Sequence, residues 1–257
     1  MNNLFDLSGR TAVVTGASSG LGIQMAKALA RNGADVAIVA RHKDKLEAVQ
    51  ADIEALGAVC KSYVCDVLEV EQINQTAAAI ESDFHKIDIL CNNAGIGWGN
   101  PAEQQADHTW NTVINTNLNA PYYFSRAAAQ GMIRRGYGKI IMTGSIHSSV
   151  AIPELPLSAY CASKAGIAGL TKALATEWAK YGITVNAIGP AYFPSAMTSK
   201  LLTKDFFQQA IKMRCPMGRP GREGELDGAV VYFASDASSY TPQPYPHNDK
   251  ASFVVAG

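Results

Sequence analysis

The fold of this chain is decided by the stretch Val13-Val14-Thr15-Gly16-Ala17-Ser18-Ser19-Gly20-Leu21-Gly22. The apolar run before the glycines predicts a buried parallel strand, and the apolar spacing after them predicts a helix. A strand, a glycine-rich turn and a helix N-terminus form an anion site, because free backbone N–H groups and the positive end of the helix dipole face one point. Gly16, Gly20 and Gly22 would let the backbone approach a pyrophosphate closely. A turn without a ligand is the alternative, but it accounts for only one or two of these glycines.

Strand and helix patterns alternate along most of the chain. The expected strands are Thr11–Thr15, Asp35–Ala40, Val59–Cys65, Ile87–Asn92, Lys139–Thr143 and Thr184–Ile188. The expected helices are Leu21–Asn32, Lys43–Leu56, Glu69–Phe84, Thr109–Arg135, Ala159–Tyr181 and Arg222–Ala234. The strands are continuous apolar runs, which is typical of a sheet covered on both faces. We predict one α/β domain over residues 1–257, a doubly wound, Rossmann-like parallel sheet with helices on both faces.

Composition argues against several classes of function. The chain has 257 residues, 22 basic and 22 acidic, and contains no basic block, so neither nucleic acid nor a membrane surface is an expected partner. No apolar run reaches transmembrane length, and no signal peptide is visible. The five cysteines lack Cys-x-x-Cys spacing, and most lie within apolar patterns, which predicts buried free thiols and no metal site. We expect a soluble, cytoplasmic protein.

The residues after the second and third strands bear on the choice of dinucleotide. An acidic residue near this point would bind the adenosine ribose hydroxyls, but the chain has Ala40 and Arg41 instead. The planar guanidinium of Arg41 suits a 2′-phosphate, and Lys43 adds charge, which favours NADP(H) with NAD(H) as the alternative. Arg41 would otherwise only begin a solvated helical turn. Asp66 is expected either to accept a hydrogen bond from adenine or to cap the next helix.

Two further segments carry reactive side chains. Asn92-Asn93-Ala94-Gly95 follows the fourth strand, at the edge where parallel sheets bind ligands, although turns also favour Asn and Gly. Tyr160 and Lys164 lie four residues apart on one helical face. A nearby ammonium lowers the pKa of a tyrosine, so Tyr160 is a candidate general acid/base for a carbonyl or alcohol oxygen. Ser145, at the end of a neighbouring strand, can hydrogen-bond the same oxygen. Beside a nucleotide loop, we favour this interpretation over a surface pair.

These motifs together resemble the short-chain dehydrogenase/reductase family. The resemblance is carried by Thr15–Gly22, Asn92–Gly95, Ser145 and Tyr160–Lys164, and it extends from about Leu7 to Tyr240. Within the family, the chain is most similar to gluconate 5-dehydrogenases and 3-oxoacyl-carrier-protein reductases. The resemblance implies hydride transfer between a nicotinamide cofactor and a small-molecule ketone or secondary alcohol. It also implies a homo-oligomer, either a tetramer or a dimer.

The resemblance also assigns roles to individual residues. It implies Tyr160 as the acid/base, Ser145 as the donor to the substrate oxygen and Lys164 as the residue that holds the ribose hydroxyls. Asn117 matches a fourth catalytic residue, which supports a water linked to the lysine. The implied cofactor-binding residues are Gly16, Ser18, Ser19, Gly20, Leu21, Gly22, Arg41, Asp66, Val67, Asn93, Ala94, Gly95, Tyr160 and Lys164.

The substrate is less defined than the chemistry. We expect a sugar acid or polyol, because no basic patch for an acidic carrier protein is evident. A 3-oxoacyl-thioester reductase and a non-catalytic dinucleotide-binding protein are the alternatives. His147 and Trp98 are further candidates for the substrate pocket. The alternative for His147, and the more common one for a lone polar loop residue, is simple solvation, and the alternative for Trp98 is ordinary packing.

Three segments depart from the family pattern. The interval between Ser145 and Tyr160 is longer than in many members, and Ala191 follows Pro190 where the family usually has glycine. Residues 191–217 are expected to form a mobile lid over the substrate. Residues 241–257 form an atypical C-terminal tail, in which three alternating prolines oppose regular sheet pairing. The run Ser252–Ala256 either forms a seventh strand after a long loop or lies outside the fold.

Overall fold

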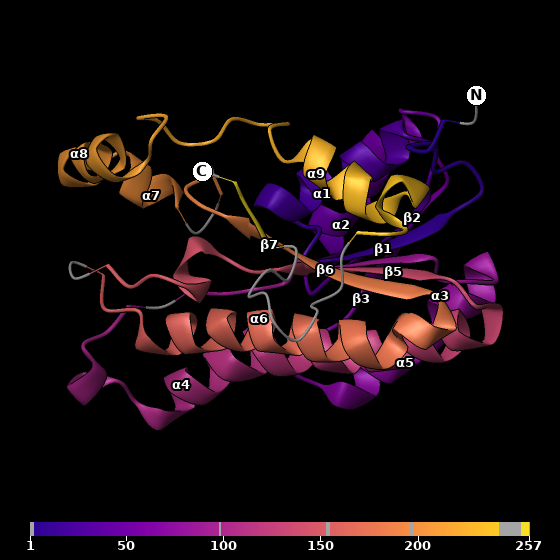
Figure 1. Cartoon of the computed structure of the whole chain (residues 1–257), viewed down its shortest axis with the longest axis horizontal. Helices are drawn as coiled ribbons and strands as arrows, with labels where there is room; N and C mark the ends of the chain where they lie inside the picture. Colours follow the sequence, from indigo (N-terminus) through magenta and orange to yellow (C-terminus); the bar gives the residue numbers. More distant parts are fainter. Residues whose placement is uncertain (1–2, 98, 153–154, 196–197, 242–252, 257) are drawn as a thin grey trace.

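A parallel sheet forms the centre of the molecule (Figure 1). The computed structural model describes residues 3–97, 99–152, 155–195, 198–241 and 253–256. Within these residues the sheet has seven strands in the order β3-β2-β1-β4-β5-β6-β7. The strands are β1 (Thr11–Thr15), β2 (Asp35–Ala40), β3 (Cys60–Val64), β4 (Ile89–Asn92), β5 (Gly138–Thr143), β6 (Ile183–Pro190) and β7 (Phe253–Ala256). All neighbouring pairs are parallel, as the continuous apolar runs predict. The predicted doubly wound α/β fold is confirmed.

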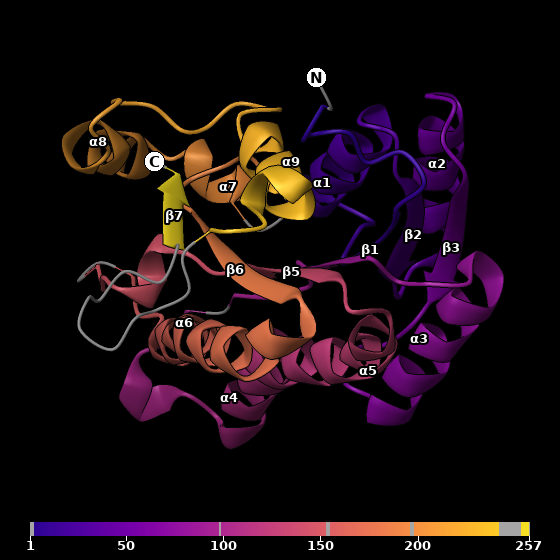
Figure 2. The same ribbon diagram turned by 45° about the vertical axis from the view of Figure 1, so that its right-hand side comes forward.

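Helices cover both faces of the sheet (Figures 1 and 2). The first face carries α1 (Gly20–Arg31), α2 (Lys43–Glu54) and α9 (Asp227–Ala234). The second face carries α3 (Val70–Phe84), α5 (Ala120–Arg135) and α6 (Ser158–Trp178), with α4 (Asp107–Ile114) packed beside α6. Two short helices, α7 (Ser199–Leu202) and α8 (Asp205–Arg214), lie at one end of the molecule in both views.

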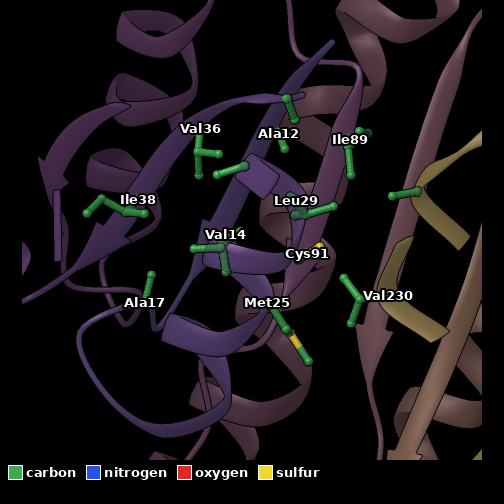
Figure 3. Close-up of a cluster of buried hydrophobic side chains, with 14 of the residues drawn as sticks. Ala12, Val14, Ala17, Met25, Leu29, Val36, Ile38, Ile89, Cys91 and Val230 are labelled. Carbon is green, nitrogen blue, oxygen red and sulfur yellow. The ribbon is translucent and has the colours of Figure 1, made fainter. Parts of the chain in front are cut away.

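Alternation along each strand divides the core into two layers. In β1, Ala12 and Val14 point to the first face and pack in one cluster with Leu29 of α1 (Figure 3). Val13, between them, belongs to the second cluster together with Phe124 of α5. Because side chains of a strand alternate between its faces, every β1 residue is buried. The strand ends are thereby held rigidly at the edge where the loops begin.

The predicted helix Thr109–Arg135 is interrupted by a π-helical turn over Asn115–Asn119. Pro121 explains this departure, because it has no N–H to donate to the carbonyl four residues earlier. The backbone N–H of Ala120 donates instead to the carbonyl of Asn115, which gives the wider i to i−5 bond. Such π turns are frequent at functional sites, and this one contains Asn117.

The predicted helix Arg222–Ala234 is shorter than expected. It begins only at Asp227, because Gly224 has a positive φ of 84° that ends any preceding helical turn. The turn before it is held by Glu225, whose carboxylate accepts two hydrogen bonds of 2.7 Å from the guanidinium of Arg219.

The C-terminal segment adds the last strand of the sheet. Phe253 to Ala256 pair in parallel with β6, with Phe253 opposite Ala187 and Ala256 opposite Pro190. Of the two alternatives for the run Ser252–Ala256, the structure therefore contains the seventh strand. The alternating prolines of the tail lie outside the described residues.

Candidate active site

The site begins where two loops meet at the carboxyl edge of the sheet. Thr15, the last residue of β1, accepts hydrogen bonds of 3.0 Å at Oγ1 from the backbone N–H groups of Asn93 and Ala94. The side-chain amide of Asn93 donates in return to the carbonyl of Thr15 over 3.1 Å. The glycine loop and the loop after β4 are thus joined as one unit. Thr15 belongs to the glycine-loop motif, but the sequence alone gives no indication of this bridging role.

Two glycines of the loop are required by the protein's own packing. Gly16 has φ of 67°, and a Cβ there would lie 2.7 Å from the Cα of Ala94. A Cβ on Gly22 would overlap the carbonyl oxygen of Gly16. We expected room for a pyrophosphate to be the reason for these glycines. The structure adds that the two loops could not pack as they do with larger residues.

The N-terminus of α1 fits an anionic group. Its N-cap residue, Ser19, makes no side-chain capping hydrogen bond, and the first turn contains no acidic residue. The first N–H groups of the helix therefore keep their capacity to donate to a ligand, and the helix dipole favours a negative charge there. Ser18, Gly20 and Leu21 adjoin this point, and Gly16 and Gly22 pack against each other beside it.

Arg41 and Asp66 lie together at the ends of β2 and β3. Their side chains form a loose ion pair, with Nη1 of Arg41 4.0 Å from Oδ2 of Asp66. Asp66 also accepts a 3.1 Å hydrogen bond from the backbone of Leu68, so it orders the turn before α3 rather than capping the helix, whose N-cap is Glu69. Val67 packs against the second core. Arg41 is exposed and precedes α2, so its guanidinium can reach a ligand phosphate.

The segment at the end of β4 contains both a residue that braces the fold and residues that face the site. Asn92 is buried, and its amide donates over 2.9 Å to Oγ of Ser125, which joins the sheet to α5. Gly95 faces the site instead. A Cβ there would lie 3.3 Å from Oδ1 of Asn117 and 3.7 Å from Nζ of Lys164. Asn93, Ala94 and Gly95 therefore connect the glycine loop with the catalytic candidates.

Asn117 is held by a dense set of hydrogen bonds. Its side chain accepts from the N–H of Ile96 and donates to the carbonyl of Ile96, both over 2.8 Å. The same amide donates over 3.1 Å to Oγ of Ser163, which in turn donates over 2.8 Å to the carbonyl of Tyr160. Ser163 thus links Asn117 to the helix of the tyrosine. Sequence patterns did not single out Ser163, and only its position between Tyr160 and Lys164 could have indicated this role.

Tyr160 and Lys164 lie on one face of α6, as predicted. Nζ of Lys164 is 5.6 Å from the centre of the Tyr160 ring and donates over 2.7 Å to the carbonyl of Thr143. Burial lowers the pKa of Lys164 to about 8. We expected the lysine to lower the pKa of Tyr160. Instead, burial raises it, and a hydrogen bond with Ser145 opposes the rise. Burial disfavours the charged phenolate, and this is the largest cause of the raised pKa.

Ser145 is oriented by a short 3₁₀ turn, Ile146–Ser148. Its hydroxyl accepts a 3.2 Å hydrogen bond from the backbone N–H of His147, so its own proton can be donated elsewhere. His147 is buried, and its ring lies edge-on to Tyr160 with 5.9 Å between the ring centres. Nδ1 of His147 lies 3.2 Å from the carbonyl of Val150, and burial lowers the pKa of the imidazole. Trp98, the other pocket candidate, lies outside the described residues.

A cavity of about 530 Å³ lies beyond the ends of β5 and β6, and Ile146, the residue after Ser145, is part of its lining. The described lining comes from residues 146 and 149–152 on one side, and from residues 191, 192 and 214–216 on the other. This volume is suitable for a small organic molecule. The walls belong to the two segments that depart from the family pattern, the interval after Ser145 and the predicted lid.

The predicted lid has a core of its own. Tyr192, Phe207, Ile211 and Cys215 form a buried cluster against which the apolar side chains after Ser145 pack. Ser195 of the same segment approaches the glycine loop, since a Cβ on Gly20 would lie 3.1 Å from Cβ of Ser195. The segment therefore contributes both to the lining of the cavity and to a contact at the N-terminus of α1. Within the described residues, no group of three His, Cys, Asp or Glu side chains could hold a metal.

Comparison with known proteins identifies the family. The model of the short chain dehydrogenases matches residues 10–205. Gluconate 5-dehydrogenase of Gluconobacter oxydans (strain 621H) is 40% identical over 238 residues, which cover 93% of this chain and 92% of that protein. The chain belongs to the short-chain dehydrogenase family. This short-chain dehydrogenase is an NAD(P)-dependent oxidoreductase acting on CH–OH groups.

Two further relatives show the range of the similarity. A probable NADP-dependent mannitol dehydrogenase of Yarrowia lipolytica (strain CLIB 122 / E 150) is 38% identical to this short-chain dehydrogenase, covering 92% of the chain and 85% of that protein. A gluconate 5-dehydrogenase from Burkholderia cenocepacia J2315, solved in complex with NADP and tartrate, has a TM-score of 0.91 at 32% identity and covers 98% of this chain and 95% of its own. No helix in the described ranges is long and apolar enough to cross a membrane.

Proposed function

We propose that this short-chain dehydrogenase interconverts a ketone and a secondary alcohol on a small polar substrate of the sugar-acid or polyol type, with NADP(H) as the preferred cofactor. The observation that carries the proposal is the convergence of Ser145, Tyr160 and Lys164. Ile146, which follows Ser145, lines a cavity of about 530 Å³. The sugar-acid and polyol dehydrogenases among its relatives support the substrate class.

Ser145 and Tyr160 would hold the reacting oxygen between them. Because the Ser145 hydroxyl accepts from the backbone of His147, its proton is directed to the substrate oxygen, where it stabilises developing negative charge. Tyr160 donates its phenolic proton to that oxygen during reduction and accepts it during oxidation. The raised pKa of Tyr160 keeps the phenol protonated in the free protein. The nicotinamide, when bound, supplies the hydride.

The remaining residues would hold and orient the cofactor. Lys164 and Asn117, whose side chains both approach Gly95, would bind the nicotinamide ribose and a water. The N-terminus of α1 would bind the pyrophosphate. Arg41 would bind the 2′-phosphate of NADP(H), with Asp66 holding the guanidinium in place. The NADP in the Burkholderia structure supports this preference.

We also propose a cytoplasmic homo-oligomer, a tetramer or a dimer. The cysteines of the described chain, Cys60, Cys65, Cys91, Cys161 and Cys215, are all free thiols, which supports a reducing compartment. Trp110 and Tyr122 expose aromatic surface on α4 and α5, which supports a contact between subunits at these helices.

Initial rates with purified protein test the function. A panel of aldonates and alditols is offered with NADP⁺ and, separately, with NAD⁺, and the products are identified by NMR. We expect formation of a ketone, with a higher kcat/KM for NADP⁺. Binding of NADPH without turnover of any member of the panel would contradict the proposed substrate class. A higher kcat/KM for NAD⁺ would contradict the cofactor preference alone.

A further inference from the structure

We propose that His147 is a specificity-determining residue whose Nε2 accepts a hydrogen bond from a substrate hydroxyl on the carbon next to the reacting one. The protein would then favour α-hydroxy ketones over ketones that lack this group. This inference rests on the proposed function and deepens it, because it states which hydroxyl of a sugar acid or polyol the site recognises. In the chemistry derived above, His147 acts only through its backbone N–H.

His147 contacts both residues that would hold the reacting oxygen. Its backbone N–H donates over 3.2 Å to Oγ of Ser145. Its ring packs against the ring of Tyr160, with 5.9 Å between the centres and 77° between the planes. The hydroxyls of Ser145 and Tyr160 are in turn hydrogen-bonded to each other. The imidazole is therefore held against one residue of the reacting centre, while the backbone of His147 is held against the other.

The tautomer of His147 follows from its hydrogen bond to the wall of the cavity. Nδ1 lies 3.2 Å from the carbonyl oxygen of Val150, a residue that lines the cavity. A carbonyl oxygen only accepts hydrogen bonds, so Nδ1 carries a proton. Burial lowers the pKa of the imidazole, which keeps the ring neutral near pH 7. In a neutral ring with its proton on Nδ1, Nε2 has a lone pair and is an acceptor.

The protein itself makes no use of this acceptor. Within the described residues, no group donates a hydrogen bond to Nε2. His147 is buried as a residue, yet Nε2 is not one of the buried polar atoms of the described chain that lack a partner, so it is accessible to solvent. An accessible acceptor beside Tyr160 is available to a bound substrate. A substrate group that displaces solvent from Nε2 has to replace the hydrogen bond that is lost.

An acceptor at this position suits a neighbouring hydroxyl rather than the reacting oxygen. The oxygen of a ketone has only lone pairs, and Ser145 and Tyr160 supply donors to it. A hydroxyl on the next carbon has a proton to donate, and it lies close to the reacting oxygen because the two carbons are bonded. Sugar acids and polyols have such hydroxyls. A ketone without one would leave Nε2 unpaired, which is how a site built to bind a hydroxyl rejects an analogue that lacks it.

Two substitutions separate the two ring nitrogens of His147. The short amide of His147→Asn can still donate to the carbonyl of Val150 from about the position of Nδ1, but it offers no acceptor at the position of Nε2. The longer amide of His147→Gln places an oxygen near the position of Nε2 and loses the contact of Nδ1. A role through Nε2 therefore predicts that Gln replaces His147 better than Asn does, and a role through Nδ1 predicts the reverse.

His85→Asn is the matched control for the exchange of a histidine for asparagine. His85 is exposed and has φ of 65°, a conformation that Asn adopts more readily than most residues. It follows α3 and precedes β4, so it lies at the amino edge of the parallel sheet, opposite the site. Its substitution should leave both substrate preference and NADPH affinity unchanged.

The test measures the reduction of matched ketones with NADPH. Hydroxyacetone is paired with 2-butanone, in which a methyl group replaces the hydroxyl. 5-Dehydro-D-gluconate is compared with its 4-deoxy and 6-deoxy analogues, each of which lacks the hydroxyl on one side of the carbonyl. Since the ratio of kcat/KM within a pair also reflects the inherent reactivity of the ketones, the quantity that matters is the change in this ratio from wild type to variant.

We expect His147→Asn to lower kcat/KM about 10-fold for hydroxyacetone and for 5-dehydro-D-gluconate. It should leave kcat/KM for 2-butanone, and for one of the two deoxy analogues, within about two-fold of the wild-type value. His147→Gln should keep most of the wild-type ratio. NADPH affinity, followed by fluorescence, shows that each variant is folded. If His147→Asn does not fold, His147→Phe, which keeps a ring beside Tyr160 but has no acceptor, takes its place.

The outcomes separate the inference from the proposed function. Equal loss on both members of a pair would show that His147 only positions Ser145 and Tyr160, and it would overturn the inference. An unchanged ratio in His147→Asn would do the same, as would a larger change in His147→Gln than in His147→Asn. In these cases the oxidoreductase function stands. If the wild-type protein binds NADPH but reduces none of these ketones, the proposed substrate class fails and the inference fails with it.

Discussion

Gly16→Ala tests how the two loops of the cofactor site are joined. At Gly16 the backbone has φ of 67°, which costs a residue with a Cβ about 1–2 kcal/mol. The new Cβ would lie 2.7 Å from Cα and 3.0 Å from the backbone nitrogen of Ala94, so relief requires the backbone of the neighbouring loop to move. Such overpacking costs a further 1–3 kcal/mol, roughly. The free energy of unfolding of the variant should be about 2–5 kcal/mol lower than that of the wild type, which corresponds to a Tm roughly 4–20 °C lower for a chain of this size.

Gly9→Ala is the matched control for the backbone cost. Gly9 has φ of 70°, but a Cβ there would meet nothing within 4 Å. Calorimetry should therefore show a loss of only about 1–2 kcal/mol, with unchanged NADPH affinity by fluorescence titration. Gly16→Ala should additionally weaken NADPH binding, because it displaces the loop that begins with Asn93. Equal losses of stability and equal NADPH affinity in the two variants would refute the proposed tight coupling of the loops.

Three further changes test the site. Lys164→Met should abolish turnover yet raise stability at pH 7 by roughly 3 kcal/mol, since the wild-type fold must bury an ammonium whose pKa is lowered from 10.5 to about 8. Unfolding titrations should show that the difference in free energy of unfolding between the two proteins falls as the pH rises from 8 to 10.5. In this range the folded wild-type protein no longer buries a charge, and the unfolded chain gradually loses its proton as well. A difference that does not change with pH would contradict this prediction. Arg41→Ala should weaken NADPH binding about 10- to 100-fold and leave NADH binding unchanged. Lys43→Ala should weaken NADPH binding less than Arg41→Ala does, because Lys43 also pairs with Glu47. Phe207→Ala should lower the free energy of unfolding by about 3–5 kcal/mol, because it removes a ring from the buried cluster of Tyr192, Phe207, Ile211 and Cys215. It should also raise KM for the substrate, and an unchanged KM would show that this cluster does not shape the substrate site.

The sequence predicted the local features of the site better than the contacts between its parts. The glycine loop, the strand ends and the spacing of Tyr160 and Lys164 follow from short-range patterns, and the structure has all of them. The hydrogen bonds from the loop of Asn93 to Thr15 join residues far apart in the chain, so no local pattern indicates them. The role of Asn92 as a brace to Ser125 was hidden for the same reason.

The differences in the second half of the chain have similar causes. The π turn around Asn117 depends on the missing N–H of Pro121, a signal present in the sequence but outweighed by a long helical pattern. The pKa of Tyr160 depends mainly on its burial, which the spacing to Lys164 does not reveal. The cavity forms between two segments that depart from the family pattern, so the resemblance could not describe its lining.

The most direct test of the account compares the wild-type protein with Tyr160→Phe. NADPH consumption is followed with a keto acid substrate, and NADPH affinity is measured in parallel by fluorescence. Removal of one hydroxyl should lower kcat by about 10²- to 10⁴-fold and leave NADPH affinity unchanged. Tyr240→Phe, at a fully exposed position, should leave both unchanged. A Tyr160→Phe variant that keeps its rate within a few-fold would contradict the assignment of Tyr160 as the general acid/base.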